Sequence, residues 1–120
     1  MLNDRPHKRL DVWRRSVDFV VRVYEQTKAF PREEEFGLKS QLRRAAVSVP
    51  SNIAEGLTRR SRNEKLHYLN IAQSSLSEID TQLEIVQKLG FLDRETHDVL
   101  INELVGIEKM LSGLSKSLRA

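Results

Sequence analysis

The 120-residue sequence contains no cysteine, so disulfides, thiolate metal sites and cysteine nucleophiles are excluded. Its apolar runs are short, and none approaches the ~20 residues that a membrane-spanning helix needs. The N-terminal segment MLNDRPHKRL also lacks the apolar core of a signal peptide. These absences predict a cytoplasmic protein with no membrane partner.

Patterns typical of enzymes and cofactor sites are missing as well. The five glycines are scattered, so there is no Gly-rich phosphate loop, and no G-x-S-x-G nucleophile elbow occurs. A di-iron bundle needs a Glu-x-x-His pair on each of two helices, whereas this chain has a single match, Glu64 to His67. The histidines fall near predicted helix ends or turns, where exposed histidines are ordinary: His7, His67 and His97. We therefore expect a protein that is not an enzyme, with no catalytic residue, no metal site and no cofactor.

Apolar residues instead recur three or four positions apart in four segments, which is the period of amphipathic helices. No segment alternates polar and apolar residues over a useful length. We predict an all-α chain with a single antiparallel, up-down four-helix bundle at residues 10–118 and a flexible basic N-terminus at residues 1–9. The predicted core positions are Leu10, Trp13, Val17, Val20 and Tyr24; Leu38, Leu42, Ala45, Ala46, Val49, Ile53 and Leu57; Leu69, Ala72, Leu76, Ile79, Leu83 and Val86; and Leu100, Leu104, Ile107, Leu111, Leu114 and Leu118.

Start and stop signals divide these segments. Pro31 cannot continue a helix, so the first helix ends before it. Ser61, with Glu64 three residues later, forms a capping box that starts the third helix. Gly90 suits a helix C-terminus, and Asp93 can cap the fourth helix.

Pro50 lies inside the second apolar segment, and the apolar stripe passes through it without changing phase. Two unrelated helices would have no reason to keep the same phase, so we predict one helix with a kink at Pro50. Because proline has no N–H, the carbonyl of Ala46 loses its usual partner. Side chains that could satisfy freed backbone groups nearby are Ser48, Ser51 and Asn52.

Charge is distributed unevenly along the chain. Residues 39–65 carry seven basic and two acidic side chains, whereas residues 66–108 carry two basic and eight acidic ones. Arginine-rich surfaces bind phosphates through bidentate hydrogen bonds and release counterions, which gives affinity without sequence readout. Aromatic residues that could stack on bases are nearly absent nearby, which argues against base-specific recognition of single strands. The candidate nucleic-acid contacts are Arg43, Arg44, Arg59, Arg60, Arg62 and Lys65, and a second basic group is Arg5, Lys8 and Arg9.

Two other interpretations of these features stay open. The arginines can form a solvated surface, and Arg59 follows Glu55 by four residues, the order that favours a surface ion pair. They can also pair with the acidic segment of a second subunit. Extra apolar residues lie off the main stripe of the fourth helix and indicate a second buried contact, hence self-association: Val99, Ile101 and Val105.

The sequence resembles the bacterial four-helix-bundle family of 23S ribosomal RNA intervening-sequence proteins in three stretches: DVWRRSVDFVVRVYEQT, FPREEEFGLKSQLRRAAVSVPSNIAEG and NEKLHYLNIAQSSLSEIDTQLEIVQKLGFL. The resemblance covers roughly residues 10–118, and relatives include the accessory protein of diversity-generating retroelements. It implies an up-down bundle that assembles into a ring, commonly a homopentamer. It also implies a basic surface presented to nucleic acid and to a partner protein such as a reverse transcriptase, without a catalytic site.

The residues and the resemblance together predict a non-enzymatic, oligomeric accessory protein that binds the RNA or DNA backbone through a basic surface. The alternative is a homo-oligomeric scaffold that binds a partner protein, with the arginines used in subunit pairing.

Overall fold

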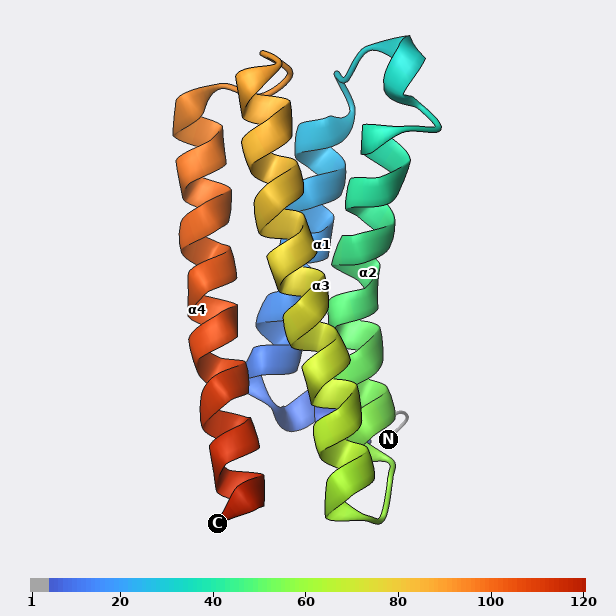
Figure 1. Ribbon diagram of the computed structural model, residues 1–120, viewed down its shortest axis with the longest axis vertical. Coiled ribbons are helices and arrows are strands. Elements are labelled where there is room, and N and C mark those ends of the chain that lie inside the picture. The colour runs from blue at the N-terminus through green and yellow to red at the C-terminus, as the bar shows by residue number, and fades with distance from the viewer. Residues whose placement is uncertain (1–4) are drawn as a thin grey trace.

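A computed structural model describes residues 5–120 of the chain (Figure 1). These residues contain α-helices and short 3-10 turns but no strand, so the predicted all-α four-helix bundle is confirmed. In chain order the elements are η1 (Pro6–Arg9), α1 (Asp11–Thr27), η2 (Arg32–Glu34), α2 (Leu38–Leu57), α3 (Arg62–Lys88) and α4 (Arg94–Arg119).

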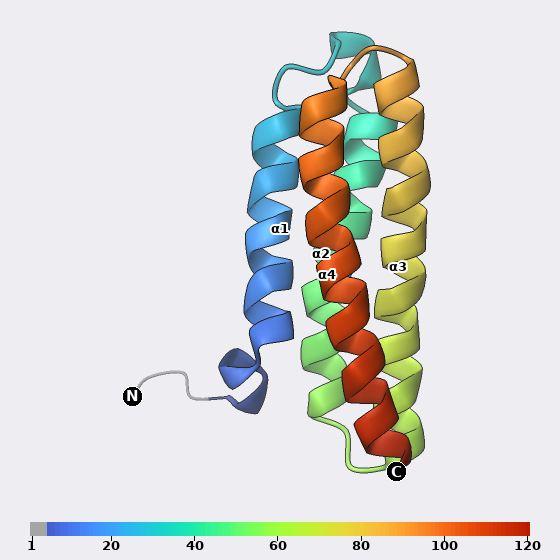
Figure 2. The same cartoon turned by 90° about the vertical axis from the view of Figure 1, so that its left-hand side faces the viewer.

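Successive helices run in alternating directions: Figure 1 shows the chain rising through α1, descending through α2, rising through α3 and descending through α4. Helices α1 and α3 each pack against both α2 and α4. The α1–α2 connection and the α3–α4 turn lie at one end of the bundle, which we call the upper end (Figures 1 and 2). The lower end holds η1, the α2–α3 connection and the C-terminus.

The core-facing side of α1 differs from the predicted stripe. The buried residues of α1 include three apolar side chains and two hydroxyl side chains: Val12, Phe19 and Val23, with Ser16 and Thr27. Tyr24, predicted to be in the core, is exposed. Ser16 and Thr27 can enter the core because their hydroxyls donate to the carbonyls of Trp13 and Val23, each at 2.8 Å. The predicted stripe is therefore only partly correct for this helix. Leu10, Trp13 and Val20 pack half-buried against the core, but the most buried positions lie on the neighbouring stripe.

The predicted stripes of the other three helices are confirmed. All six predicted positions of α3 are buried. In α2 and α4 the central positions are buried, and the positions near the helix ends are half-buried against the core: Leu38, Leu57, Leu114 and Leu118. Helices α2 to α4 thus carry an apolar stripe that packs on one shared core.

Side chains cap the two helices for which caps were predicted. The Ser61 hydroxyl accepts a hydrogen bond from the backbone N–H of Glu64 at 3.0 Å, at the start of α3. Asp93 Oδ1 accepts from the backbone N–H of Thr96 at 2.8 Å, at the start of α4. The backbone and side-chain hydrogen bonds of Thr96 lower the pKa of the Asp93 carboxyl.

Gly90 ends α3 as predicted, with a left-handed φ of +83° that favours glycine. The next residue, Phe91, donates its N–H to the carbonyl of Val86 at 2.9 Å, as in a Schellman motif. The Phe91 ring then lies 5.8 Å from the ring of Phe30 in the α1–α2 connection. This contact joins the two connections at the upper end.

Helix α2 continues through Pro50, so the prediction of one helix rather than two is confirmed. The kink at Pro50 stays a prediction. Nearby side chains donate to carbonyls on either side of Ala46 rather than to Ala46 itself. These hydrogen bonds join Ser48 to Ala45, Ser51 to Val47 and Asn52 to Ser48, at 2.7 to 2.8 Å.

Residues 1–4 of the predicted flexible N-terminus lie outside the described residues. The residues after them form η1, and the buried ring of His7 packs edge-on against Trp13, with centroids 5.0 Å apart. His97 is also buried, so two of the three histidines differ from the expected exposure. Across residues 5–120, no helix combines the length and the apolar character needed to cross a membrane.

Candidate nucleic-acid interface

The six predicted nucleic-acid contacts lie in two groups rather than one. Arg43 and Arg44 lie on the upper half of α2. The other four surround the α2–α3 connection at the lower end: Arg59, Arg60, Arg62 and Lys65. The 16 positions from Arg43 to Arg59 correspond to about 24 Å at the rise of an α-helix. The two groups therefore belong to different parts of the surface.

The Arg43 side chain bonds to other residues of the bundle and joins α2 to the end of α1. Its Nε donates to Thr27 Oγ1 at 2.8 Å, and a terminal nitrogen donates to the Tyr24 carbonyl at 3.0 Å. Its guanidinium also lies over the Tyr24 ring. The last carbonyls of a helix lack partners within it, so Arg43 stabilises this end of α1. The neighbouring Arg44 is exposed and donates only to Ser40 Oγ, at 3.3 Å.

Arg59 is also engaged within the protein. One terminal nitrogen lies 2.9 Å from Glu55 Oε2 and 3.0 Å from the Tyr68 hydroxyl, and the guanidinium stands over the Tyr68 ring. The Glu55 contact is the ion pair that the spacing predicts. Arg59 thus links the end of α2 to the first turns of α3.

The other three members of the lower group are less engaged. Arg60 is exposed and makes no hydrogen bond or ion pair with the described residues. Arg62 donates to the carbonyl of Arg119, and Lys65 donates to the carbonyl of Leu57, both at 3.4 Å. These long contacts leave the charges available to an external anion.

Cations from two other segments lie at the same end of the bundle. Figures 1 and 2 show the C-terminus of α4 next to the α2–α3 connection, and η1 at the same end of the bundle, below α1. We call the combined set the basic end: Arg5, Lys8, Arg9, Arg59, Arg60, Arg62, Lys65, Lys116 and Arg119. Two of the acidic side chains nearby are paired, because Glu55 contacts Arg59 and Asp11 contacts Arg14. Burial lowers the pKa of His7, and the charges of Lys8 and Arg5 lower it further.

Lys116 and Arg119 were not among the site residues predicted from the sequence. A local excess of positive charge could have indicated them, because residues 109–120 carry three basic side chains and no acidic one. Distance along the chain concealed it: Arg119 lies 57 positions after Arg62, which donates to its carbonyl. Only the return of α4 to the lower end brings the two segments together.

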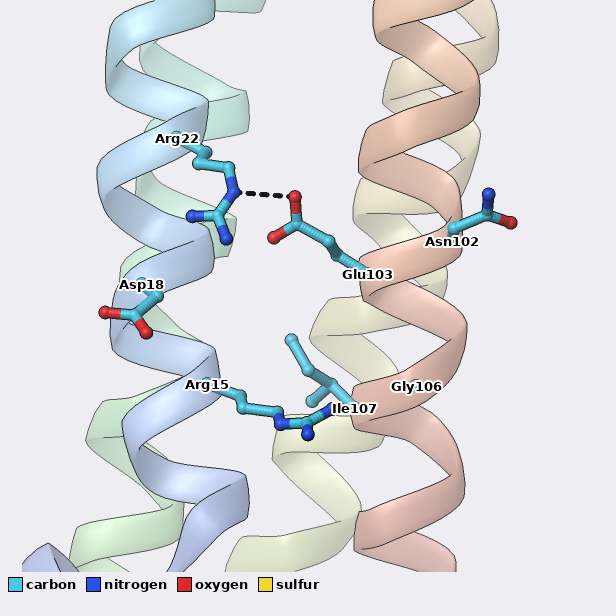
Figure 3. Close-up of a pocket in the computed structure, with 7 residues that line it drawn as sticks. All are labelled: Arg15, Asp18, Arg22, Asn102, Glu103, Gly106 and Ile107. Carbon is cyan, nitrogen blue, oxygen red and sulfur yellow. Dashed lines mark hydrogen bonds and ion pairs between the residues drawn. The ribbon is translucent and has the colours of Figure 1, made fainter.

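A groove of about 250 Å³ lies between α1 and α4, away from the basic end (Figure 3). Arg22 Nε donates to Glu103 Oε1 at 2.7 Å across this groove, and Arg15 extends below that pair. Asp18 also lines the groove, so its charged groups are two guanidinium groups and two carboxylates. Its near-neutral lining gives little net attraction for a phosphate. Within residues 5–120, no three His, Asp or Glu side chains are grouped so that they could hold a metal ion.

Comparisons with known proteins agree with the fold. The family model for 23S rRNA-intervening sequence proteins matches residues 8–113. The chain is similar to a crystal structure of a protein with unknown function from the S23 ribosomal protein family of Bacteroides thetaiotaomicron. The two share 28% sequence identity and a TM-score of 0.79, over 88% of this chain and 98% of that one. No curated protein matches the sequence. The chain belongs to the 23S rRNA-intervening sequence protein family.

Proposed function

We propose that this protein binds the phosphate backbone of RNA or DNA through its basic end and has no catalytic activity of its own. One observation carries the proposal: three segments far apart in sequence gather nine cationic side chains at one end of the bundle. Such a surface attracts a polyanion and releases its counterions on binding. The interaction needs no base contacts, so it selects for backbone charge rather than for sequence.

The hydrogen bonds of these cations support a smaller set of proposed contacts. One terminal nitrogen of Arg59 contacts both Glu55 and Tyr68, so the charge of this arginine is already paired within the protein. Exposed or weakly bonded cations remain as the contacts to phosphate: Arg60, Arg62, Lys65, Lys116 and Arg119. We place the interface at these residues and not at Arg43.

Binding to a DNA duplex of about 20 base pairs, measured by fluorescence anisotropy across a salt series, tests this function. The test variant is R60A/R62A/K65A at the lower end. Its matched control is K28A/R32A/R94A, which removes the same charge from exposed positions outside the basic end. We expect the lower-end variant to bind more weakly, with a slope of log K against log salt reduced by about 2 to 3.

The control variant should bind almost as the unmodified protein does. Equal affinities and equal salt slopes for both triple variants would show that the basic end is not the interface. All the substituted side chains are exposed or half-buried, so each variant should keep its helices. Circular dichroism checks this.

We also propose that the protein forms homo-oligomers. Apolar side chains lie exposed on α1 and α2, where Val21 is 51% exposed and Val47 is 39% exposed. Val99 and Val105 on α4 are exposed as well. The segment at residues 66–108, which forms most of α3 and α4, carries the acidic excess that a basic α2 of a second copy would meet. A repeated basic end would also strengthen a weak contact through avidity.

Sedimentation velocity tests the oligomer. The variant V21D/V47D should sediment as a smaller species, because a charge at either position opposes its burial against a second copy. The control T58D/S117D introduces the same charge at exposed positions of the lower end, outside residues 66–108 and away from both valines. If the homo-oligomer forms but nucleic acid does not bind, the protein is instead a scaffold for a partner protein.

A further inference from the structure

Phe36 is 95% exposed, far more than any other large apolar side chain among the described residues. It lies at the upper end, just before α2, and borders a groove of about 370 Å³. We call this the upper groove; its lining residues are Tyr24, Glu35, Phe36, Lys39, Ser40, Arg43 and Arg44. Nothing inside the bundle accounts for an aromatic ring left in water at this position.

Hydrogen bonds hold the backbone around Phe36 in place. Glu34 Oε1 accepts from the backbone N–H of Leu38 at 3.1 Å, and the Glu34 carbonyl accepts from the N–H of Gly37 at 3.1 Å. A Cβ at Gly37 would lie 2.8 Å from Glu34 Oε1, so a larger residue there would have to displace the Glu34 carboxylate that bonds to Leu38. Phe36 is therefore presented on an ordered turn, and a ligand that covers it need not order the loop first.

The second aromatic member of the groove is Tyr24, which is 39% exposed. Arg43 stands over its ring and is itself fixed by the hydrogen bond to Thr27. The groove therefore has aromatic side chains from two separate elements, one at the end of α1 and the other beside the start of α2.

The charge of the upper groove favours an anion. Lys39, Arg43 and Arg44 contribute three positive charges, and Glu35 contributes one negative charge. Glu35 is already paired with Lys39 at 3.0 Å, which leaves the two arginines as the excess. Arg44 is the more exposed of the two, and its contact with Ser40 leaves most of its donors free.

The side chains that line the upper groove suit a nucleotide better than they suit the surface of a partner protein. The only apolar members of the groove are its two aromatic rings, and its other five members are polar or charged. The centre of a protein–protein interface is instead depleted in charged residues. Aromatic faces beside guanidinium groups are the combination that binds unpaired nucleotides, through stacking on the base and hydrogen bonds to the phosphate.

We propose that the upper groove binds an unpaired nucleotide of a single-stranded nucleic acid, with the base stacked on Phe36 and a phosphate bound by Arg44. This inference rests on the proposed function and adds a substrate class to it. It also revises the expectation that aromatic residues able to stack on bases are nearly absent near the arginines. Tyr24 lies 20 positions before Arg44 in sequence, and the packing of α1 on α2 brings both into one groove.

Fluorescence anisotropy with labelled oligonucleotides tests the inference. The probes are oligoadenylate of about ten nucleotides, an abasic single strand of the same length, and a DNA duplex. F36A should weaken oligoadenylate binding about 5- to 150-fold, which corresponds to the loss of one stacked base. F36W should keep the affinity, because tryptophan offers a larger stacking face. R44A should weaken oligoadenylate binding too, whereas duplex binding by F36A should be unchanged.

Several results would overturn the inference. One is equal binding of oligoadenylate by F36A and the unmodified protein, and another is equal binding of the abasic strand and oligoadenylate. A third is a smaller sedimenting species for F36A with unchanged oligoadenylate binding, which would assign Phe36 to a protein contact. If duplex binding persists in these cases, the proposed function stands without the groove. If no probe binds, both fail together.

Discussion

The backbone of Gly56 on α2 lies so close to α3 that a Cβ added there would be 3.0 Å from the Cβ of Tyr68. The same atom would lie 3.2 Å from the carbonyl oxygen of Lys65. A backbone carbonyl cannot move aside as a flexible side chain can. Gly56 therefore sets the distance between α2 and α3 at the lower end, next to the candidate interface.

Replacing Gly56 with alanine should lower the free energy of unfolding by about 1 to 3 kcal/mol, because α2 and α3 must separate. Gly113→Ala on α4 is the matched control, since a Cβ there meets nothing within 4 Å. The control should be neutral or stabilising by up to about 1 kcal/mol, as expected for glycine replaced in a helix. Urea unfolding of both variants measures the difference. A neutral G56A would show that the contact relaxes without cost.

The orientation of α1 can be tested with two truncations. Phe19 is fully buried, so F19A should lower the free energy of unfolding by about 3 to 5 kcal/mol. Val17 belongs to the stripe that periodicity predicted, but it is only half-buried, so V17A should cost about 1 kcal/mol or less. Urea unfolding distinguishes the two faces, and a larger loss for V17A would contradict the orientation described above.

Arg43 and Arg44 are adjacent in sequence but should respond differently to substitution. R43A removes two hydrogen bonds and a cation–π contact at the end of α1, and should lower the free energy of unfolding by about 1 to 3 kcal/mol. R44A should change it by about 0.5 kcal/mol or less, because its side chain is exposed. Equal losses in thermal or urea unfolding would mean that Arg43 is not a structural residue.

The cap at Asp93 predicts a pH dependence. Hydrogen bonds from Thr96 hold the folded-state pKa of the Asp93 carboxyl below its ordinary value of 3.8. A lowered carboxyl pKa stabilises the fold above the unfolded-state value, and this stabilisation disappears as the pH falls through the folded-state pKa. The stability difference between the unmodified protein and D93A should therefore be constant near neutral pH and shrink below about pH 4. Urea midpoints measured over this range give the curve, and a difference that persists in acid would rule out the ionised cap.

Pro50→Ala tests the predicted kink in α2. The substitution restores an N–H that can donate to the carbonyl of Ala46, so the helix should straighten. Residual dipolar couplings of the backbone N–H groups on either side of residue 50 report the angle between the two halves. Identical couplings in both proteins would mean that Pro50 does not bend the helix. If P50A changes neither the stability nor the size of the oligomer, any bend at Pro50 has no role in folding or assembly.

Most of the fold could be predicted because its signals are local. The stripes of α2, α3 and α4, the caps at Ser61 and Asp93, and the stop at Gly90 all depend on residues within a few positions of one another. Helix α1 was the exception. Its apolar residues fit two neighbouring stripes, and the more buried one contains Val12, Phe19 and Val23. That stripe also includes Ser16 and Thr27, whose hydroxyls are satisfied by their own helix, which hydrophobicity alone does not indicate.

The candidate site was less predictable, because charge in a sequence carries no position in space. Seven basic residues between Lys39 and Lys65 looked like one cluster, yet a helix extends about 1.5 Å per residue and separates them into two groups. Their hydrogen bonds then divide them again, since Arg43 and Arg59 serve packing while Arg44 and Arg60 stay available.

The order of residues was sufficient to specify four amphipathic helices, their caps and the family to which the chain belongs. The tertiary structure alone established that Lys116 and Arg119 join Arg62 at the lower end, and that Tyr24 and Phe36 border one groove with Arg44. The physical reason is that helix formation and capping act over one or two turns. The alternating directions of the helices instead place residues dozens of positions apart at the same end of the bundle.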